Sequence, residues 1–343
     1  MSDARPATIH DVARKAGVAV SSVSRALSDH PDVSEGMRAK VLKAAESLGY
    51  APDPVAQSMR SGSTRTVGLV VRDFGNPLFA EIMNGAEQVL TEAGYTLLVM
   101  NSGGDEPREL ERISLLRRRR VDALLLSTIT EGGAALRKAV TGFGKPVVLL
   151  DRNLGGKGME SGVVFDHASG VNAATADLLA LGHRRIAMVT GSTDIRPTRE
   201  RLRGFHEAYA AAGLEVPPDL EVTGVFSSGF AQQRTIELMT KPVRRRPTAL
   251  MSGGIQSTVG VLEGLSELGI RPGSDVALIV CDDLPWLRVL RPAISVVTRD
   301  AEGLGRAAAE QALSLVKGGK PTQRTLATRY APRETSTARR PRR

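Results

Sequence analysis

The chain has 343 residues, of which 41% are hydrophobic and 24% are charged, as expected of a soluble protein with more than one compact unit. The single cysteine, Cys281, excludes an internal disulfide and a cysteine-based metal site. No apolar run approaches the roughly 20 residues that span a membrane, and the first residues do not form an export signal. The net charge of +9 is compatible with a polyanionic partner. Together these features predict a cytoplasmic protein.

Residues 8–50 have the pattern of three short helices joined by tight links. Thr8 and Asp11 have the spacing of a capping box, which predicts the start of the first helix. Gly17 ends that helix and supplies the turn to a second helix over residues 19–27. Ser34 is a good N-cap for the third helix. The apolar stripe expected on the third helix consists of Val41, Leu42, Ala45 and Leu48.

The second of these helices is expected to present a polar face to solvent. Val18, Val23 and Leu27 can face the core of the three-helix unit. The residues left on the outside are Val20, Ser21, Ser24 and Arg25. A helix exposed in this way fits the roughly 12 Å wide major groove of DNA. A small three-helix unit without a DNA role is the alternative interpretation of this spacing.

From Thr66 onward, short β-branched runs alternate with amphipathic helical patterns. The predicted strands are 67–71, 96–100, 123–126, 146–150, 162–165, 185–190, 249–252 and 276–281, and the predicted helices include 76–93, 108–118, 169–181, 202–212 and 255–268. Near-continuous apolar strands between helices imply parallel sheets that are covered on both faces. The series is too long for one simple sheet, so the sequence predicts an α/β fold with two doubly wound lobes.

The segments TIHDVARKAGVAVSSVSRAL and VSEGMRAKVLKAAESLGYAPDPVAQSM resemble the N-terminal domain of the LacI/GalR family of repressors. The resemblance implies that the second helix enters the major groove and that Val20, Ser21 and Arg25 choose the bases. Arg25 can bind guanine O6 and N7 bidentately, worth about 1–3 kcal/mol of discrimination. Within residues 1–50, the other residues expected to contact the DNA are Thr8, Ala19, Ser24, Ser28, Ser34 and Tyr50. The family usually has serine at Ala19 and threonine near Met37, so one N-cap bond is expected to be lost and one phosphate contact to be altered.

Residues 51–65 are rich in Pro, Gly, Ser and Thr around one short apolar stripe, Pro54–Arg60. Two turns of helix are marginal alone in water. The resemblance implies that this hinge helix folds when two copies meet over the operator centre, where Met59 replaces the usual leucine wedge in the minor groove. Small Ala56 allows a close approach to the groove, and Arg60 is expected to contact the DNA as well. A plain linker is the alternative.

The resemblance continues to about residue 330 through segments such as NPLFAEIMNGAEQVLTEAGYTLLVMNS, LLALGHRRIAMVTG and RERLRGFHEAYAAAGL. It implies a periplasmic-binding-protein-like core, in which a ligand cleft lies at the carboxyl ends of the strands. The expected organisation is a helix-turn-helix domain (1–50), a hinge (51–65), a two-lobed effector-binding and dimerisation domain (66–330) and a disordered basic tail (331–343). One lobe is expected to comprise about 66–161 and 293–320, and the other about 162–292 and 321–330.

Residues of the cleft are carried over from the same resemblance. Arg201 matches an arginine that holds an effector carboxylate or hydroxyl, and Asp282 matches an acid that accepts sugar hydroxyls. An ion pair that braces the cleft is the alternative for these two residues. Trp286 either stacks on a sugar ring or plugs a hydrophobic gap. The other expected effector-binding residues are Phe74, Leu78, Phe79, Asp151, Asp166, Phe226, Ile255 and Arg299.

Two departures from the family pattern bear on the effector. Gly254-Ile255 stands where the family usually has Asn-Asp, and Arg299 stands near a usual glutamine. The resemblance implies a sugar or sugar derivative as the effector. Because of the two departures, a less hydroxylated molecule, an acidic molecule or no effector are the alternatives.

Two other classes of protein share the predicted core, namely α/β enzymes and transport binding proteins. The sequence has no phosphate-binding P-loop, no dinucleotide fingerprint and no nucleophile elbow, and its five histidines show no metal-ligand spacing. We therefore expect no enzyme activity, no cofactor and no metal. Two operator half-sites need two reading heads, and the tail has no apolar heptad, which predicts a homodimer on palindromic double-stranded DNA.

Overall fold

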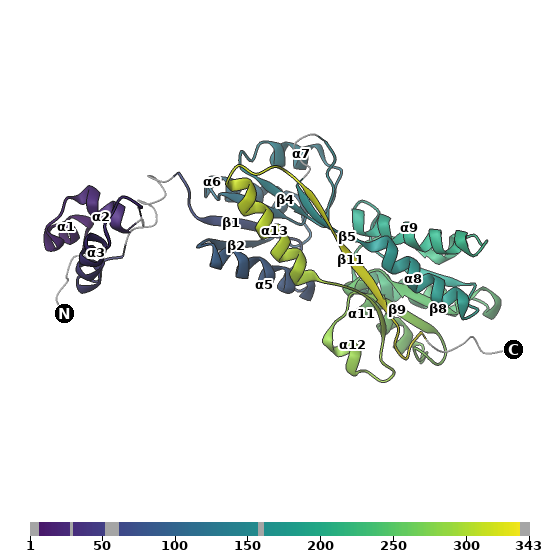
Figure 1. Cartoon of the computed structure of the whole chain (residues 1–343). Coiled ribbons are helices and arrows are strands. Elements are labelled where there is room, and N and C mark those ends of the chain that lie inside the picture. Colours follow the sequence, from purple (N-terminus) through teal and green to yellow (C-terminus); the bar gives the residue numbers. More distant parts are fainter. Residues whose placement is uncertain (1–6, 28–29, 52–61, 157–160, 337–343) are drawn as a thin grey trace. The chain divides into compact units, whose positions relative to one another are not determined.

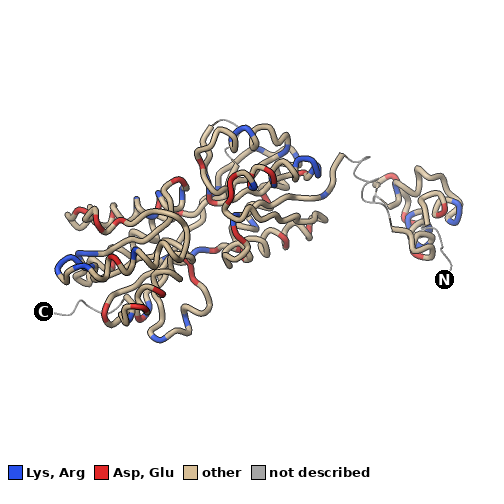
Figure 2. Tube along the Cα trace, turned by 180° about the vertical axis from the view of Figure 1, so that it is seen from behind, with Lys and Arg blue, Asp and Glu red and all other residues tan. Residues whose placement is uncertain are grey.

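The computed structural model describes residues 7–27, 30–51, 62–156 and 161–336 (Figure 1). The chain divides into two compact units, Met1–Thr64 and Arg65–Arg343, called here the helical unit and the α/β unit. Figure 2 shows Lys and Arg along both units, interspersed with Asp and Glu. None of the described helices combines the length and the apolar character that a membrane crossing requires.

The helical unit contains α1 (Ile9–Ala16), α2 (Val20–Leu27) and α3 (Glu35–Ser47), as the sequence predicts. Each helix contributes one completely buried valine to a small core, and these are Val12, Val23 and Val41. Gly17 has a φ of 61°, which glycine adopts without Cβ strain, and it turns the chain between α1 and α2.

The helix starts predicted from the sequence are present. The backbone N–H and the hydroxyl of Thr8 both donate to the Asp11 carboxylate, at 3.0 and 2.7 Å. The Ser34 hydroxyl accepts the Met37 N–H at 3.4 Å. One expectation for α3 is wrong: Leu42 is 50% exposed, and Ala44 is buried instead. The reason is that α3 buries the stripe 41, 44 and 45, and Leu42 lies outside it.

The α/β unit contains one continuous sheet with the strand order β2-β1-β3-β4-β5-β11-β10-β9-β8-β6-β7. Its strands are β1 (Thr66–Val71), β2 (Thr96–Asn101), β3 (Ala123–Leu126), β4 (Val147–Leu150), β5 (Gly162–Asp166), β6 (Ile186–Val189), β7 (Glu221–Val222), β8 (Ala249–Ser252), β9 (Ala277–Cys281), β10 (Ser295–Arg299) and β11 (Gln323–Ala331). Neighbouring strands are parallel except β10 and β11, which are antiparallel.

Helices cover both faces of this sheet, which is why the strands are apolar throughout. In the first lobe, α5 (Pro77–Glu92) and α13 (Ala301–Val316) pack on one face, and α6 (Glu106–Arg118) and α7 (Ala134–Thr141) pack on the other. In the second lobe, α8 (His167–Ala180) and α9 (Arg196–Ala211) cover one face, and α10 (Ser228–Thr240), α11 (Ile255–Glu267) and α12 (Pro285–Val289) cover the other. Two short 3-10 helices, Pro218–Leu220 and Val243–Arg245, lie in loops of the second lobe. This is the expected doubly wound arrangement.

Strand β11 joins the two lobes (Figure 1). Its residues 323–327 pair with β5 in the first lobe, and residues 328–331 pair with β10 in the second. The lobe boundaries expected from the sequence therefore need correction. Strand β5 (162–166) lies in the first lobe rather than the second, and β10 (295–299) lies in the second rather than the first. The pairing partners decide the lobe of a strand, and chain order alone does not reveal them.

The expectation of a disordered tail from residue 331 is wrong for its first six residues. Thr335 and Ser336 are completely buried. The Thr335 hydroxyl donates to the carbonyl of Leu278 in β9 at 2.6 Å, and the Ser336 hydroxyl lies 2.6 Å from that of Ser295 in β10. Short polar side chains can be ordered in this way because sheet ends offer them unpaired backbone groups. Residues 337–343 lie outside the described part of the chain.

Glycines allow neighbouring helices to pack at close range. A Cβ on Gly305 of α13 would lie 2.0 Å from the Ile82 carbonyl oxygen of α5. A Cβ on Gly260 of α11 would lie 2.0 Å from the Ser228 carbonyl oxygen of α10. No real Cβ fits at that distance, so the helices pack with their backbones in contact.

Candidate functional site

The outward face of α2 is the candidate DNA-reading surface. Ser21 and Arg25 are exposed on it, and Val20 and Ser24 are half-buried. Val23 and Ala26 on the opposite side are buried, so the core fixes which side of α2 is presented. Ala19 lies just before α2 and has no side-chain oxygen that could cap it.

The other predicted DNA contacts are placed less uniformly. Thr8 is half-buried, and its hydroxyl donates to Asp11 within the helix cap. Ser34 is exposed, whereas Tyr50 packs against the core of the helical unit. The remaining members of that set lie outside the described residues, together with the predicted hinge helix, and these are Ser28, Ala56, Met59 and Arg60.

The candidate effector site is a cavity between the two lobes, with a volume of about 80 Å³. Eight residues named from the sequence line it, namely Leu78, Phe79, Asp151, Arg201, Phe226, Ile255, Asp282 and Arg299. They come from both lobes and follow the carboxyl ends of the strands or begin the next helices, which is where doubly wound folds bind ligands.

Three residues named from the sequence do not line this cavity. Phe74 is 51% exposed at the surface. Asp166 caps α8 by accepting the Ser169 N–H at 3.1 Å. Trp286 lies on α12 and is 38% exposed. Each follows a strand or opens a helix as the cavity residues do, but its side chain is oriented elsewhere.

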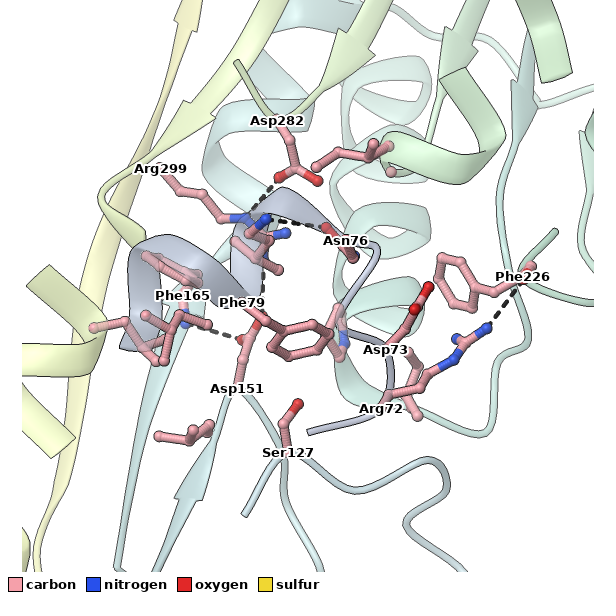
Figure 3. Close-up of a pocket in the computed structure, with 18 of the residues that line it drawn as sticks. Arg72, Asp73, Asn76, Phe79, Ser127, Asp151, Phe165, Phe226, Asp282 and Arg299 are labelled. Carbon is pink, nitrogen blue, oxygen red and sulfur yellow. Dashed lines mark hydrogen bonds and ion pairs between the residues drawn. The ribbon is translucent and has the colours of Figure 1, made fainter. Parts of the chain in front are cut away.

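Arg299 makes the central contacts of the cavity, and it lies between two carboxylates (Figure 3). Its guanidinium is 2.6 Å from Asp282 and 3.2 Å from Asp151. Burial by itself would lower the pKa of Arg299, but the charges of Asp282 and Asp151 raise that pKa above its ordinary value. Arg201 instead donates to the carbonyl of Gly253 at 2.5 Å. The ion pair that braces the cleft is therefore Arg299–Asp282 and not Arg201–Asp282.

Asp151 is held as a carboxylate by its neighbours. One of its oxygens lies 2.8 Å from His167 Nε2, and the other accepts the Phe165 N–H at 3.1 Å. Burial alone would raise the pKa of Asp151, but the contact with His167 and the charge of Arg299 hold that pKa well below its usual range. Burial lowers the pKa of His167 to about 4, so its ring is neutral at pH 7 and donates from Nε2 to Asp151.

Contacts between the lobes surround the cavity. Arg72, which follows β1, donates to the Phe226 carbonyl at 3.0 Å and lies over the Phe226 ring (Figure 3). Gln256 at the start of α11 donates to Asp73 at 2.9 Å. At another place between the lobes, Glu131 of the first lobe accepts a hydrogen bond of 2.9 Å from the backbone N–H of Arg196 in the second lobe.

Comparisons with known proteins agree with these features. Residues 8–53 match the family model described as bacterial regulatory proteins of the lacI family, and residues 175–336 match that of a periplasmic binding protein-like domain. The chain is 35% identical over 307 residues to the ribose operon repressor of Escherichia coli (strain K12), which covers 88% of this chain and 91% of that protein. The chain belongs to the LacI family.

One further relative and one solved structure match this LacI-family chain over nearly its whole length. The repressor PurR of Aliivibrio fischeri (strain MJ11) is 31% identical over 314 residues, covering 91% of this chain and 92% of that one. A crystal structure of the lac repressor dimer with operator has a TM-score of 0.83 at 23% identity, covering 97% of this chain and 100% of that chain. The family and the periplasmic-binding-protein-like fold expected from the sequence are confirmed. These relatives are repressors by name and not enzymes.

The structure of this LacI-family chain also places residues in the cavity that sequence reasoning missed. The charged and polar ones are Arg72, Asp73, Asn76, Ser127, Arg152 and Gln256. Arg72 and Arg152 each stand one or two positions after the end of a buried strand. That position was the available signal, because ligand clefts in doubly wound folds lie at the carboxyl ends of strands.

Proposed function

We propose that this LacI-family protein is a homodimeric repressor that reads a palindromic operator with α2 and responds to a small molecule bound between its lobes. The proposal is supported by relatives that are named ribose operon repressor and transcriptional repressor PurR. It is also supported by the similar lac repressor, whose crystal structure is that of a dimer bound to operator. A dimer of identical chains matches a palindrome because both have two-fold symmetry.

The observation that carries the DNA-binding role is the exposed face of α2. Arg25 stands at its far end and can reach guanine, while Ser21 near the start is exposed for hydrogen bonds to base edges. Ser24 and Ser34 are proposed to contact phosphates, which fixes register rather than sequence.

The cavity is proposed to bind the effector, through residues of both lobes. A ligand held by both lobes favours one arrangement of the lobes over another, and it changes operator affinity only through that difference. We further propose a cytoplasmic location and no catalytic reaction, because the relatives act as bacterial repressors.

The test is the binding of the full-length protein to duplexes selected from a random pool. Arg25→Ala should weaken binding to the selected operator about tenfold or more, and should relax the preference at one base position in each half-site. Fluorescence anisotropy at fixed salt gives the dissociation constants.

Lys43→Ala removes one positive charge from an exposed position of α3 and serves as the matched control. Both variants should lose similar, small amounts of affinity for random duplex, because each removes one charge. A wild-type protein that selects no palindrome, or an Arg25→Ala protein with unaltered operator affinity, would contradict the proposal.

A further inference from the structure

The cavity holds more hydrogen-bond donors than acceptors. Four arginines line it, namely Arg72, Arg152, Arg201 and Arg299, against the three aspartates Asp73, Asp151 and Asp282. Each guanidinium offers five N–H donors and no acceptor. A ligand that fits this lining must therefore supply acceptor atoms.

The aspartates have little capacity left for a ligand. Both oxygens of Asp151 are engaged, by Phe165 N–H and by His167 with Arg299. Both oxygens of Asp73 are engaged as well, by the Gly75 N–H at 2.8 Å and by Gln256 at 2.9 Å. Asp282 keeps one oxygen, since Arg299 occupies the other at 2.6 Å. Carboxylates accept sugar hydroxyls well only when their oxygens are open, so this lining is poorly suited to a neutral polyol.

Three of the arginines differ from the aspartates in that their charges are not held in close ion pairs. Among the described residues, Arg72, Arg152 and Arg201 have no carboxylate oxygen within 4.0 Å. Arg201 is only 3% exposed, its Nη1 donates to a carbonyl, and its buried Nε has no partner. Burial lowers the pKa of Arg152, and also that of Arg72. Buried cations normally have an anionic partner, since desolvation without one is costly.

We propose that the effector carries an oxyanion group, a carboxylate or a phosphate, and that Arg201 is its principal contact with Arg72 and Arg152 as supporting charges. Arg299 favours this preference, because it pairs with Asp151 and Asp282 and leaves Arg201 without an ion-pair partner among the described residues. This inference rests on the proposed function, in that the cavity is taken to be the effector site.

The test uses the full-length protein and sets of ligands that share a sugar and differ in one neutral or acidic group. D-glucose, D-glucuronate and D-glucose 6-phosphate share one ring and differ at one carbon, and D-ribose with D-ribose 5-phosphate forms a second set. Calorimetric titration at constant ionic strength should show at least one acidic member binding about tenfold or more tighter than its neutral partner. The carboxylate and phosphate arms then distinguish the two oxyanions.

Inorganic phosphate tests the same site without dependence on ring stereochemistry. It should raise the melting temperature of the wild type above that in sodium chloride of equal ionic strength. Arg201→Met should abolish this rise. Arg72→Met changes a half-buried residue of the cavity and should reduce the rise, and it replaces Arg201→Met in the test if that variant does not fold. Arg244→Met removes an exposed arginine of the second lobe, outside the cavity, and should leave the rise unchanged.

The inference is overturned if no acid binds more tightly than its neutral partner and phosphate gives no rise beyond chloride. It is also overturned if Arg201→Met, Arg72→Met and Arg244→Met respond alike, since phosphate would then act elsewhere. Operator binding by the same preparation without ligand is measured in parallel. Retained operator binding with a failed anion test rejects only the ligand class, whereas loss of operator selectivity rejects the proposed function.

Discussion

Arg299 and His167 contact the same carboxylate, and they differ in what they contribute. Arg299 joins Asp151 of the first lobe to Asp282 of the second through ion pairs of 3.2 and 2.6 Å. His167 is 2% exposed and holds Asp151 from the second lobe through one hydrogen bond. Arg299 keeps its charge at all ordinary pH values, whereas the histidine can titrate.

The first prediction concerns the pH dependence of stability at His167. Its folded-state pKa of about 4 lies below the unfolded value of about 6.5, so the unfolded chain takes up a proton first as the pH falls. The stability from the neutral ring is therefore complete above pH 6.5 and is lost as the pH falls toward 4. Between pH 6.5 and 5 the loss should be about 2 kcal/mol.

The measurement is urea unfolding of the wild type and of His167→Gln at several pH values. Glutamine can still donate to Asp151 but does not titrate, so the variant should lose less stability over this interval. Equal slopes for the two proteins would contradict the buried, neutral state of His167.

The candidate site could be predicted from the sequence only in part, because a strand end gives the position of a residue and not the direction of its side chain. Asp151 and Asp282 were named from the family resemblance, and both are in the cavity. Asp166 also follows a strand, but it turns back to cap α8. Arg152 was missed because a charge beside a loop is usually solvated, whereas this side chain is 8% exposed and donates to the carbonyls of Thr128 and Asp151.

The close packing of paired helices leaves little room for a larger side chain at their contact. Gly85 on α5 and Gly305 on α13 face one another's backbones, each with 2.0 Å to a carbonyl oxygen at its Cβ position. Backbone atoms cannot move aside as a flexible side chain can. Even one added methyl group must therefore separate α5 from α13.

We expect Gly305→Ala to destabilise the α/β unit by roughly 1–3 kcal/mol, the usual cost of overpacking. Thermal unfolding followed by circular dichroism gives the change. Gly229→Ala in α10 is the matched control, since its Cβ would meet no atom within 4 Å, and alanine there should be neutral or stabilise by up to about 1 kcal/mol. If both variants melt alike, the close approach of α5 and α13 is wrong.

Most strands and helices were predictable because their apolar runs are fully buried, as in β3 and β8. Strand β11 was not, because its sequence QRTLATRYA is largely polar and most of its residues are exposed or half-exposed. Its place between β5 and β10 depends on pairing partners more than 20 residues away, which local patterns do not encode. The exchange of β5 and β10 between the expected lobes has the same cause.

At the scale of the whole α/β unit, Glu131 connects the two lobes through hydrogen bonds and an ion pair. Its side chain is 5% exposed, and it accepts the N–H of Asn153 at 3.0 Å in its own lobe. Across the gap it accepts the Arg196 N–H at 2.9 Å and pairs with Arg199 at 2.5 Å. Any motion that separates the lobes on this side must break these contacts.

Glu131→Gln should make this opening more frequent, because an amide loses the ion pair and one of its two acceptors. Hydrogen exchange read by mass spectrometry should be about tenfold faster in the peptide that contains the Arg196 amide. Glu263→Gln, an exposed change on α11, is the control and should leave that peptide unaffected. Unchanged exchange in Glu131→Gln would mean that the lobes are held together elsewhere.

The shared strand also has a consequence for biosynthesis. Residues 323–331 are inner members of both halves of the sheet, yet the ribosome makes them after every other strand. Since domains generally fold as they emerge from the N-terminus, α1 to α3 are complete while both lobes still lack a neighbour for β5 and β10. A nascent chain can thus contain a folded helical unit before the α/β unit, which is proposed to control DNA binding, has folded.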